Sequence, residues 1–452
     1  MPRLFGTNGI RGIVNDTMNA KLAMEVGMAI ATYLENKGTV LIGTDTRLSK
    51  DMLKSAVTSA LLSGGCNVVD VGTAPTPAIQ YMIPRMGANL GVIITASHNP
   101  PQWNGIKCAD ADGTELAREK EEVIEDIYFK KAFKTSEWDT VGKLTSAEVI
   151  TTYIDGIVEK INVQAIKEAN MKVVLDCANG AASYSSPYLF ERLGCQVITL
   201  NAHPQGTFPG HRSEPTPDNL QDLMAITRES GADLGIAHDG DADRVIFIDE
   251  KGQYVFGDKS LALVAKQIVN RNNGGIVVTG INSSQAVEDV VTAEGGKIIY
   301  TQVGSPIVAR KMMETGAIFG GEENGGLMFP EHQYCRDGAM TAAKLLEIIA
   351  LSGKSASTLF ASLPQYQQYK VKTACPNEKK ERALEVLAGS IQGKEVITMD
   401  GVKIIEDEGW ILVRPSGTEE IYRIYTEAKD LGTAKSWAED YKNKIEQIIA
   451  RL

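Results

Sequence analysis

The chain has 452 residues, 43% of them hydrophobic and 23% charged, which predicts a soluble globular protein of roughly two to four domains. A net charge of −11 excludes bulk attraction to nucleic acid or to an anionic membrane, so any phosphate site must be a local basic pocket. No apolar run reaches the length of a membrane span, the first residues have no signal-peptide pattern, and the six cysteines form no Cys-x-x-Cys pair. We therefore expect a cytoplasmic protein in a reducing compartment, with no nucleic-acid or membrane partner.

The chain contains a weak internal repeat. Residues 87–91, 231–235 and 316–320 read GANLG, GADLG and GAIFG, and each opens an apolar strand that ends in polar residues. Strands that alternate with helices predict mixed, mostly parallel sheets covered on both faces. The predicted fold class is therefore α/β, with three related α/β domains in tandem.

A smaller domain of another type is expected at the C-terminus. Charged helices over residues 115–132 and 146–161 are predicted to end the first domain and to lead into the second. After residue 365 the pattern changes to short strands over 371–373, 402–405, 410–415 and 422–428, followed by a helix over 434–452. The predicted domains are 1–145, 146–251, 252–364 and, as a small α+β domain, 365–452.

A serine follows the apolar strand expected over residues 90–94. Ser97 and His98 come after this strand, and Pro100 disfavours helical geometry at the preceding residue, which predicts an extended, exposed turn. A hydroxyl at the carboxyl end of a strand lies where open α/β sheets build their sites. A helix cap is the alternative, because Ser, Thr and Asn commonly precede helices.

Three carboxylates alternate with small residues after the corresponding strand of the second domain. Asp239, Asp241 and Asp243 offer hard oxygen ligands of the kind that suit Mg²⁺ or Ca²⁺. An EF-hand is disfavoured because Arg244 stands where its sharp turn requires glycine. A solvated acidic turn remains as an alternative.

A loop near the C-terminus has the groups needed to hold a phosphate. Arg414 offers charge-assisted bonds, while Ser416, Gly417 and Thr418 offer hydroxyls and a closely approachable backbone. A hairpin turn with polar surface residues has the same composition.

Four further residues are candidates for the same site. Glu322 and Asn324 suit the hydroxyls of a sugar, although alone they only make an acidic loop. Arg11 lies among glycines near the N-terminus. Lys107, in a predicted strand after Ser97, either reaches back into the cleft or is a solvated edge residue.

Taken together, these segments resemble the α-D-phosphohexomutase superfamily over essentially the whole chain. Residues 95–100 are similar to its phosphoserine loop, and its metal, sugar and phosphate loops follow in the family's order at residues 239–244, 321–325 and 414–419. The resemblance implies three related α/β domains and a smaller C-terminal one, which agrees with the repeat. Residues 4–12 are most similar to phosphoglucosamine mutases, particularly archaeal-type members.

The resemblance implies catalysis by phosphoryl transfer. Ser97 carries a phosphoryl group and, with Asp239, Asp241 and Asp243, holds one Mg²⁺ per chain, while a sugar bisphosphate serves as activator. Lys107 is the implied general acid/base, with a pKa depressed by a cationic cleft, and His98 and Arg11 complete the catalytic set. The implied substrate-binding residues are Arg244, Glu322, Asn324, Arg414, Ser416, Gly417 and Thr418.

One position departs from the family pattern. Many relatives end the sugar loop with a histidine proposed as a second proton-transfer group, and this chain has Gly326 there. The resemblance therefore identifies no second acid/base.

The expected reaction is the interconversion of glucosamine 6-phosphate and glucosamine 1-phosphate for UDP-N-acetylglucosamine synthesis, with a phosphosugar as partner and a monomer or homodimer as the assembly. A phosphomannomutase/phosphoglucomutase is the first alternative. A serine-phosphorylating, metal-dependent phosphatase is more remote, because such enzymes usually need several histidine ligands and the five histidines here are not clustered. A non-catalytic sugar-phosphate sensor would need neither Ser97 nor the three aspartates.

Overall fold

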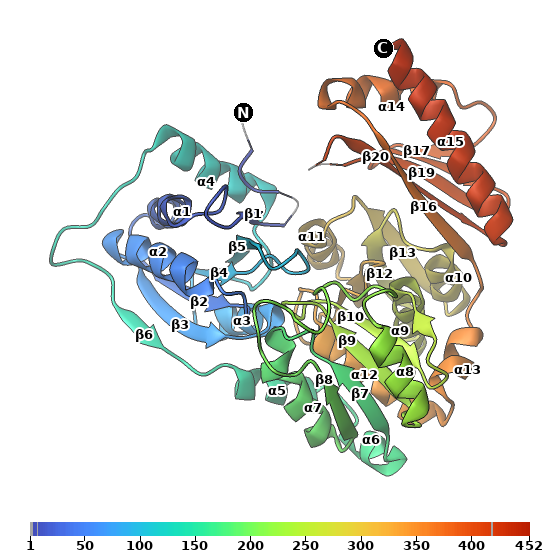
Figure 1. The fold of residues 1–452 in the computed structure, drawn as a ribbon, viewed down its shortest axis with the longest axis horizontal. Helices are drawn as coiled ribbons and strands as arrows, with labels where there is room; N and C mark the ends of the chain where they lie inside the picture. Colours follow the sequence, from blue (N-terminus) through green and yellow to red (C-terminus); the bar gives the residue numbers. More distant parts are fainter. Residues whose placement is uncertain (1–2, 7, 417–418) are drawn as a thin grey trace.

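The computed structural model describes residues 3–6, 8–416 and 419–452, whose strands form four sheets in chain order. Figure 1 shows the first three sheets, each flanked by helices, meeting around the middle of the molecule, while the C-terminal domain stands beside the third. Three mixed α/β sheets followed by an antiparallel C-terminal sheet confirm the predicted fold class.

The first sheet has the strand order β1-β5-β4-β2-β3-β6. Its central strand β4 (Leu90–Ile94) is buried along its whole length, pairs in parallel with β2 (Thr39–Thr44) and runs antiparallel to β5 (Trp103–Asp110). The remaining strands are β1 (Ile10–Ile13), β3 (Asn67–Thr73) and β6 (Leu144–Ser146). The helices of this domain are α1 (Ala20–Tyr33), α2 (Lys50–Ser63), α3 (Thr76–Arg85) and α4 (Arg118–Lys130).

The second sheet has the order β11-β10-β9-β7-β8. β9 (Leu234–His238) and β10 (Val245–Asp249) are fully buried antiparallel neighbours, so the six residues that join them are fixed at both ends. The other strands are β7 (Lys172–Asp176), β8 (Gln196–Leu200) and β11 (Tyr254–Val255). The helices are α5 (Ile150–Val158), α6 (Val163–Ala169), the 3₁₀ helix η1 (Ala181–Tyr184), α7 (Ser186–Leu193) and α8 (Gln221–Glu229).

The third sheet has the order β13-β12-β14-β15, of which only the β14–β15 pair is antiparallel within the described residues. Its strands are β12 (Gly275–Gly280), β13 (Gly296–Thr301), β14 (Phe319–Gly321) and β15 (Leu327–Met328). Its helices are α9 (Gly257–Arg271), α10 (Gln285–Ala293), α11 (Ser305–Thr315), α12 (Gly338–Ser352) and α13 (Ala356–Ala361).

The C-terminal sheet is antiparallel, in the order β16-β20-β19-β18-β17. Its strands are β16 (Gln367–Ala374), β17 (Val396–Ile397), β18 (Val402–Glu406), β19 (Gly409–Pro415) and β20 (Ile421–Ala428). The 3₁₀ helix η2 (Asn377–Lys379), α14 (Lys380–Gly389) and α15 (Leu431–Arg451) complete the domain.

The hydrophobic core shows how the domains are joined. One cluster of buried apolar side chains runs through the first three domains and includes Ile93, Tyr153 and Phe319. The C-terminal domain has a core of its own and meets the third domain in a small cluster of Ile281, Trp410 and Leu412. The first three domains therefore form one packed block, to which the fourth is attached by a smaller interface.

Several predicted helices differ in extent from those observed. The predicted helix over 146–161 was wrong at its start: residues 144–146 form β6, which pairs with β3, and α5 begins only at Ile150. The helix predicted over 115–132 is α4, and the one over 434–452 is α15. All six cysteines are buried and free. None of the helices in the described residues is long and apolar enough to cross a membrane.

Candidate active site

Ser97 lies in a tight turn directly after β4, with a backbone φ of 50° in the left-handed region. Its amide donates to Thr95 Oγ1 at 2.8 Å, and its hydroxyl donates to Asp239 Oδ2 at 2.8 Å. The side chain is buried, and its oxygen also lies 3.3 Å from His98 Nδ1. The turn that was predicted to be exposed is therefore closed over by the second domain, which brings the serine to the metal loop.

The buried side chain of Arg47 fixes the shape of this loop through hydrogen bonds to its backbone. Its side chain is completely buried and pairs with Asp45 at 3.0 Å, while Asp45 also accepts from Thr95 Oγ1 at 2.7 Å. The guanidinium donates at 2.6–2.8 Å to four backbone carbonyls of the loop, those of Ser97, Asn99, Pro100 and Trp103. A buried charge satisfied in this way holds the serine in one position. The sequence did not single out Arg47; the only signal was the polar end of the strand before it.

The three predicted metal-loop carboxylates lie together between β9 and β10. One oxygen of each of Asp239, Asp241 and Asp243 lies within 4.8 Å of the others, and all three side chains are buried. Asp241 Oδ1 and Asp243 Oδ1 are buried oxygens that accept no hydrogen bond from the described residues. Clustered carboxylates with free oxygens, next to a serine hydroxyl, match the ligands that a small hard cation prefers. The residues present therefore fit a Mg²⁺ ion.

Close backbone contact joins the serine loop to the metal loop. A Cβ atom at Gly240 would lie 2.6 Å from the carbonyl oxygen of Ser97. Thr76, at the start of α3, donates its hydroxyl to Asp241 Oδ2 at 2.8 Å and its amide to the Asp241 carbonyl at 2.9 Å. The first domain thus fixes the metal loop of the second on both sides.

Basic side chains surround the carboxylates. Lys107 on β5 places its Nζ 2.8 Å from Asp241 Oδ2 and 3.3 Å from Asp243 Oδ2, and Arg244 donates to Asp239 Oδ2 at 3.0 Å. Burial raises the pKa of Asp239 to about 7 against the opposing charge of Arg244. Burial acts in the same direction on Asp241, but the Lys107 ammonium outweighs it and holds the pKa of Asp241 below its ordinary value.

Lys107 corrects one expectation. Burial lowers its pKa, and the cations Arg11 and Arg336 act in the same direction as predicted for a cationic cleft, but the facing charges of Asp241 and Asp243 outweigh these effects and raise the pKa above its ordinary value. The predicted depression of the Lys107 pKa was therefore wrong, because the nearest groups are carboxylates and not cations. In this arrangement Lys107 is an ammonium that can donate a proton.

His98 and Arg11 also belong to the cluster around Ser97. Burial, and then the charges of Arg244 and Arg11, lower the pKa of His98 to about 2, so the ring is uncharged at neutral pH. Arg11 on β1 donates to Asn99 Oδ1 at 2.8 Å, and burial lowers its pKa too. The structure thus brings the predicted catalytic and metal residues together, with Arg244 beside them.

The predicted sugar loop lies between β14 and β15. Glu322 is buried and accepts from Arg336 Nη1 at 3.0 Å, and Arg336 Nη2 donates to Asp243 Oδ2 at 2.6 Å. Asn324 Oδ1 accepts from the amide of Gly326 at 3.1 Å, which folds the loop back on itself. Arg336, which the sequence did not single out, therefore connects the sugar loop with the metal loop.

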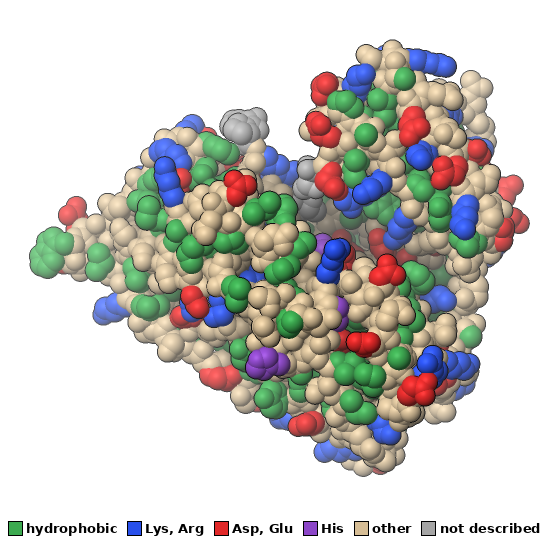
Figure 2. Space-filling view, in the orientation of Figure 1, with side chains coloured by type: hydrophobic (Ala, Val, Ile, Leu, Met, Phe, Trp, Pro, Cys, Tyr) green, Lys and Arg blue, Asp and Glu red, His purple; other side chains and the backbone are tan. Residues whose placement is uncertain are grey.

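The predicted phosphate loop belongs to the C-terminal domain, across the hollow that Figure 2 shows between the first and fourth domains. Arg414 on β19 pairs with Asp400 at 2.7 Å, and the same carboxylate oxygen accepts from the amide of Val303 at 2.9 Å. Ser416 Oγ accepts from the amide of Glu419 at 3.2 Å. Two further residues predicted for this loop lie outside the described residues: Gly417 and Thr418.

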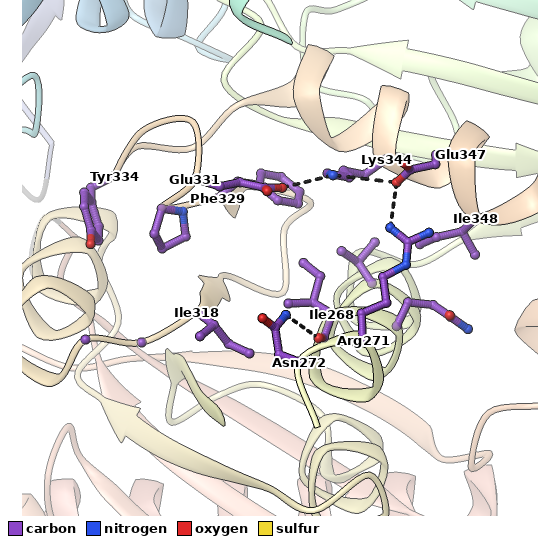
Figure 3. A pocket seen from close by; sticks show the side chains of 15 residues that line it. Ile268, Arg271, Asn272, Ile318, Phe329, Glu331, Tyr334, Lys344, Glu347 and Ile348 are labelled. Carbon is purple, nitrogen blue, oxygen red and sulfur yellow. Dashed lines mark hydrogen bonds and ion pairs between the residues drawn. The ribbon is translucent and has the colours of Figure 1, made fainter. Parts of the chain in front are cut away.

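A separate cavity of about 460 Å³ lies between α9, α12 and the segment 329–334 (Figure 3). Its charged groups neutralise one another: Lys344 lies 3.0 Å from Glu331, and Arg271 lies 3.0 Å from Glu347. Of the residues predicted for the site, none that the structure describes lines this cavity. The candidate active site is therefore the cluster around Ser97.

Comparison with known proteins defines the class. Four successive segments match the four domain models of phosphoglucomutase/phosphomannomutase: α/β/α domain I at residues 2–135, domain II at 151–252, domain III at 256–366 and the C-terminal domain at 371–444. The chain belongs to the phosphoglucomutase/phosphomannomutase family, within the α-D-phosphohexomutase superfamily, as its resemblance implied, and is a phosphohexomutase.

Individual relatives span the whole chain. A phosphoglucomutase/phosphomannomutase of Thermococcus kodakarensis is 46% identical over 97% of this chain and 97% of its own length. A phosphoglucosamine/phosphogalactosamine mutase of Sulfurisphaera tokodaii is 42% identical over 99% of this chain and 100% of its own length. Among solved structures, a phosphoglucomutase/phosphomannomutase family protein of Burkholderia thailandensis superposes with a TM-score of 0.89 at 29% identity, covering 98% of this chain and 97% of that one.

Proposed function

We propose that this phosphohexomutase interconverts glucosamine 6-phosphate and glucosamine 1-phosphate through a phosphorylated Ser97. The proposal rests chiefly on the 2.8 Å contact between the Ser97 hydroxyl and Asp239, inside a buried group of three carboxylates. A phosphoryl group at this position would meet strong repulsion without a cation. Mg²⁺ bound by Asp239, Asp241 and Asp243 would supply the neutralising charge that phosphoryl transfer requires.

The residues around Ser97 account for every bond and proton in the phosphoryl transfer. Phospho-Ser97 gives its phosphoryl group to the free hydroxyl of the sugar phosphate, so that the P–O bond to Ser97 breaks and a P–O bond to the sugar forms. The Lys107 ammonium donates a proton to the departing Ser97 oxygen, and the proton of the sugar hydroxyl restores the charge of Lys107. The sugar bisphosphate then turns round, and its other phosphoryl group returns to Ser97 by the reverse steps.

The remaining residues hold the substrate. We assign the phosphate that does not react to the C-terminal loop, where Arg414 offers paired charge-assisted bonds. Glu322 and Asn324 accept from the sugar hydroxyls in either orientation. Arg11 and Arg244 place fixed positive charge beside the site of phosphoryl transfer. The uncharged ring of His98 lies there as well. The other members assigned to the phosphate loop are Ser416, Gly417 and Thr418.

The choice of sugar rests on relatives. The Sulfurisphaera tokodaii protein, at 42% identity, is described as acting on amino sugars, which supports glucosamine. The Thermococcus kodakarensis protein, at 46%, is described as a phosphoglucomutase/phosphomannomutase, so glucose and mannose phosphates are the second candidate. The predicted domain boundaries, cytoplasmic location and monomeric or homodimeric state stay predictions.

The deciding experiment offers the purified protein three substrates in turn: glucosamine, mannose and glucose 6-phosphate, each with Mg²⁺ and a trace of sugar bisphosphate. Fastest isomerisation of the glucosamine ester supports the proposal, whereas faster turnover of mannose or glucose 6-phosphate supports the second candidate. Release of inorganic phosphate without an isomer identifies a phosphatase. Intact-mass spectrometry completes the test, since full activity with no phosphate on Ser97 at any stage contradicts the phosphoserine.

A further inference from the structure

Arg336 stands where the first, second and third domains meet. It follows β15 and directly precedes Asp337, whose side chain caps α12 by accepting from the amide of Met340 at 2.9 Å. The Asp337 amide also donates to the Leu327 carbonyl at 3.0 Å, which fixes the backbone beside β15. The Arg336 side chain is only 10% exposed. Its backbone is therefore held on both sides while its side chain extends into the site.

Two ion pairs fix the end of this side chain. Nη1 donates to Glu322 Oε2 at 3.0 Å, and Nη2 donates to Asp243 Oδ2 at 2.6 Å. Glu322 belongs to the sugar loop of the third domain and Asp243 to the metal loop of the second. A planar guanidinium with fixed donor directions sets the distance between these two loops, which a single ammonium group would do less well.

The position of Arg336 also explains Gly326. A Cβ atom at residue 326 would lie 2.3 Å from Cδ of Arg336 and 2.9 Å from its Cγ. The backbone of Gly326 is not in the left-handed region, so its conformation does not require glycine. The stem of Arg336 cannot move aside cheaply because both ion pairs hold its far end. Glycine is required at this position by its neighbour.

We propose that Arg336 is a substrate-positioning residue that fills the place of the sugar loop's last side chain, and that residue 326 is glycine to admit it. This inference rests on the proposed function. Burial raises the pKa of Glu322, and the charge of Arg336 opposes that rise, so Arg336 favours the ionised form of this carboxyl group and holds it in place. A guanidinium keeps its proton at every working pH and cannot relay one. Arg336 therefore does not take over the proton-transfer role proposed for the histidine that many relatives have at the end of the sugar loop.

A double-mutant cycle tests the pairing of the two residues. kcat/KM is measured for Gly326→Ala, Arg336→Ala and the double variant, with the sugar phosphate that the wild type isomerises fastest. We expect Gly326→Ala to lower kcat/KM about tenfold and Arg336→Ala about a hundredfold, the range that misplaced groups produce. In the Arg336→Ala background the second change should cost much less, because the Cγ and Cδ atoms are gone and only the 3.2 Å contact with Asn324 Oδ1 remains. Losses that simply multiply overturn the inference.

A second set of readouts separates positioning from mere structural support. Arg336→Ala should act mainly through KM, and the kcat–pH profile should keep both of its limbs, because Arg336 carries no proton in the reaction. The KM should rise further at low pH, because Glu322 loses the charge that opposes its raised pKa. Arg336→Lys retains the charge and most of the stem, so it should recover part of the KM. Loss of a limb of the pH profile, or a Lys variant no better than Ala, contradicts this role.

Two control variants test whether loss of an ion pair or addition of a methyl group elsewhere in the protein changes kcat/KM. Arg271→Ala removes a 3.0 Å ion pair with Glu347 beside the separate cavity of Figure 3, and Gly389→Ala adds a methyl group into open space. Both should retain the wild-type kcat/KM.

The thermal midpoint of each variant shows whether the variant folds. The midpoints also test the contact between Arg336 and residue 326 if the wild type isomerises none of the three sugar phosphates. In that event the proposed function fails on its own, while the packing of Arg336 against residue 326 is judged from the melts. Gly326→Ala must lower the midpoint in the wild-type background, and by much less in the Arg336→Ala background. Equal shifts in both backgrounds overturn the inference.

Discussion

Ser97 is held in a left-handed backbone conformation, with φ at 50°. A side chain with a Cβ atom costs roughly 1 kcal/mol there relative to glycine. We expect Ser97→Ala and Ser97→Gly both to lose about 10³-fold or more in kcat, because each lacks the oxygen that carries the phosphoryl group. Ser97→Gly should be the more stable of the two by about 1 kcal/mol in thermal melts. Ser260→Ala, which removes a buried hydroxyl on α9, is the control; wild-type turnover in Ser97→Ala would contradict the phosphoserine.

Lys107, together with Arg244 and Arg336, balances the charge of the carboxylate cluster. Because it lies 2.8 Å from Asp241 and 3.3 Å from Asp243, Lys107→Met should cost about 3 kcal/mol of stability in EDTA. Mg²⁺ should restore much of this loss, since it binds only the folded carboxylates. Melting curves with and without Mg²⁺ check this, beside Lys130→Met, which breaks an exposed pair with Asp126. An equal loss in both buffers would show that the carboxylates hold no cation.

The sequence predicts the loop residues of the site better than the residues that hold them. Ser97 and the three aspartates could be named because each group follows an apolar strand, and strand ends are visible locally. Arg47 and Arg336 could not be named, because they act on Ser97 and Asp243, which lie 50 and 93 positions away in the chain. No local pattern marks a basic residue whose partners are brought to it only by packing. The predicted direction of the Lys107 pKa shift was wrong for the same reason.

Helices and strands that depend on packing between distant segments were also hard to predict from the sequence. β4, β9 and β10 were predictable because apolar residues and glycine fill all of them but the last position of β9 and of β10, and they are buried throughout. β6 was missed because Leu144, Thr145 and Ser146 are all exposed, and they form a strand only through pairing with β3. α14 was missed as well, since it depends on packing against β18 and α15. The burial pattern therefore predicted these central strands, whereas the fully exposed edge strand β6 has no burial pattern to detect.

α12 depends on a cap that also binds a second element. Asp337 accepts from the Met340 amide at 2.9 Å and from the Tyr153 hydroxyl on α5 at 2.6 Å. Asp337→Ala should therefore cost about 3 kcal/mol, from the lost cap and the buried unpaired hydroxyl together. Asp430→Ala, at the exposed cap of α15, should cost only about 1 kcal/mol. Chemical denaturation measures both; equal costs would mean that the Tyr153 contact contributes nothing.

At the scale of the whole molecule, the C-terminal domain is attached through the apolar cluster of Ile281, Trp410 and Leu412 and through a few buried polar contacts. Glu427 on β20 accepts from the Gln285 amide at 2.7 Å and from Trp410 Nε1 at 2.9 Å, which joins the domain to α10. Lys403 donates to the Ile281 carbonyl at 2.8 Å. Since the predicted phosphate loop lies on this domain and Ser97 on the first, the attachment sets the width of the cleft between them (Figure 2).

Asp258, in the first turn of α9, is the group at this interface that should respond to pH. It accepts from the Ser284 amide at 2.9 Å and from Gln368 Nε2 at 2.9 Å, and Gln368 also donates to Glu427 at 3.0 Å. Burial, and then the charge of Glu323, raise its pKa from about 3.8 to about 8; Glu427 adds to the rise and Lys370 opposes it. The folded protein therefore keeps a proton that the unfolded chain has lost at neutral pH.

The sign of the effect follows from this raised pKa. The stability that Asp258 contributes is complete below its unfolded pKa near 3.8 and is lost as the pH rises through about 8. Thermal midpoints measured at several pH values between about 5 and 7.5 should fall less steeply in Asp258→Asn than in the wild type, because an amide mimics the protonated carboxyl at every pH. Burial lowers the pKa of Lys403 to about 8, so this group begins to titrate only at the upper end of the range, and it does so in both proteins. The same slope in both proteins would show that Asp258 is ionised in the folded state, and the interface would then contain a buried charge held by Gln368 and Lys370.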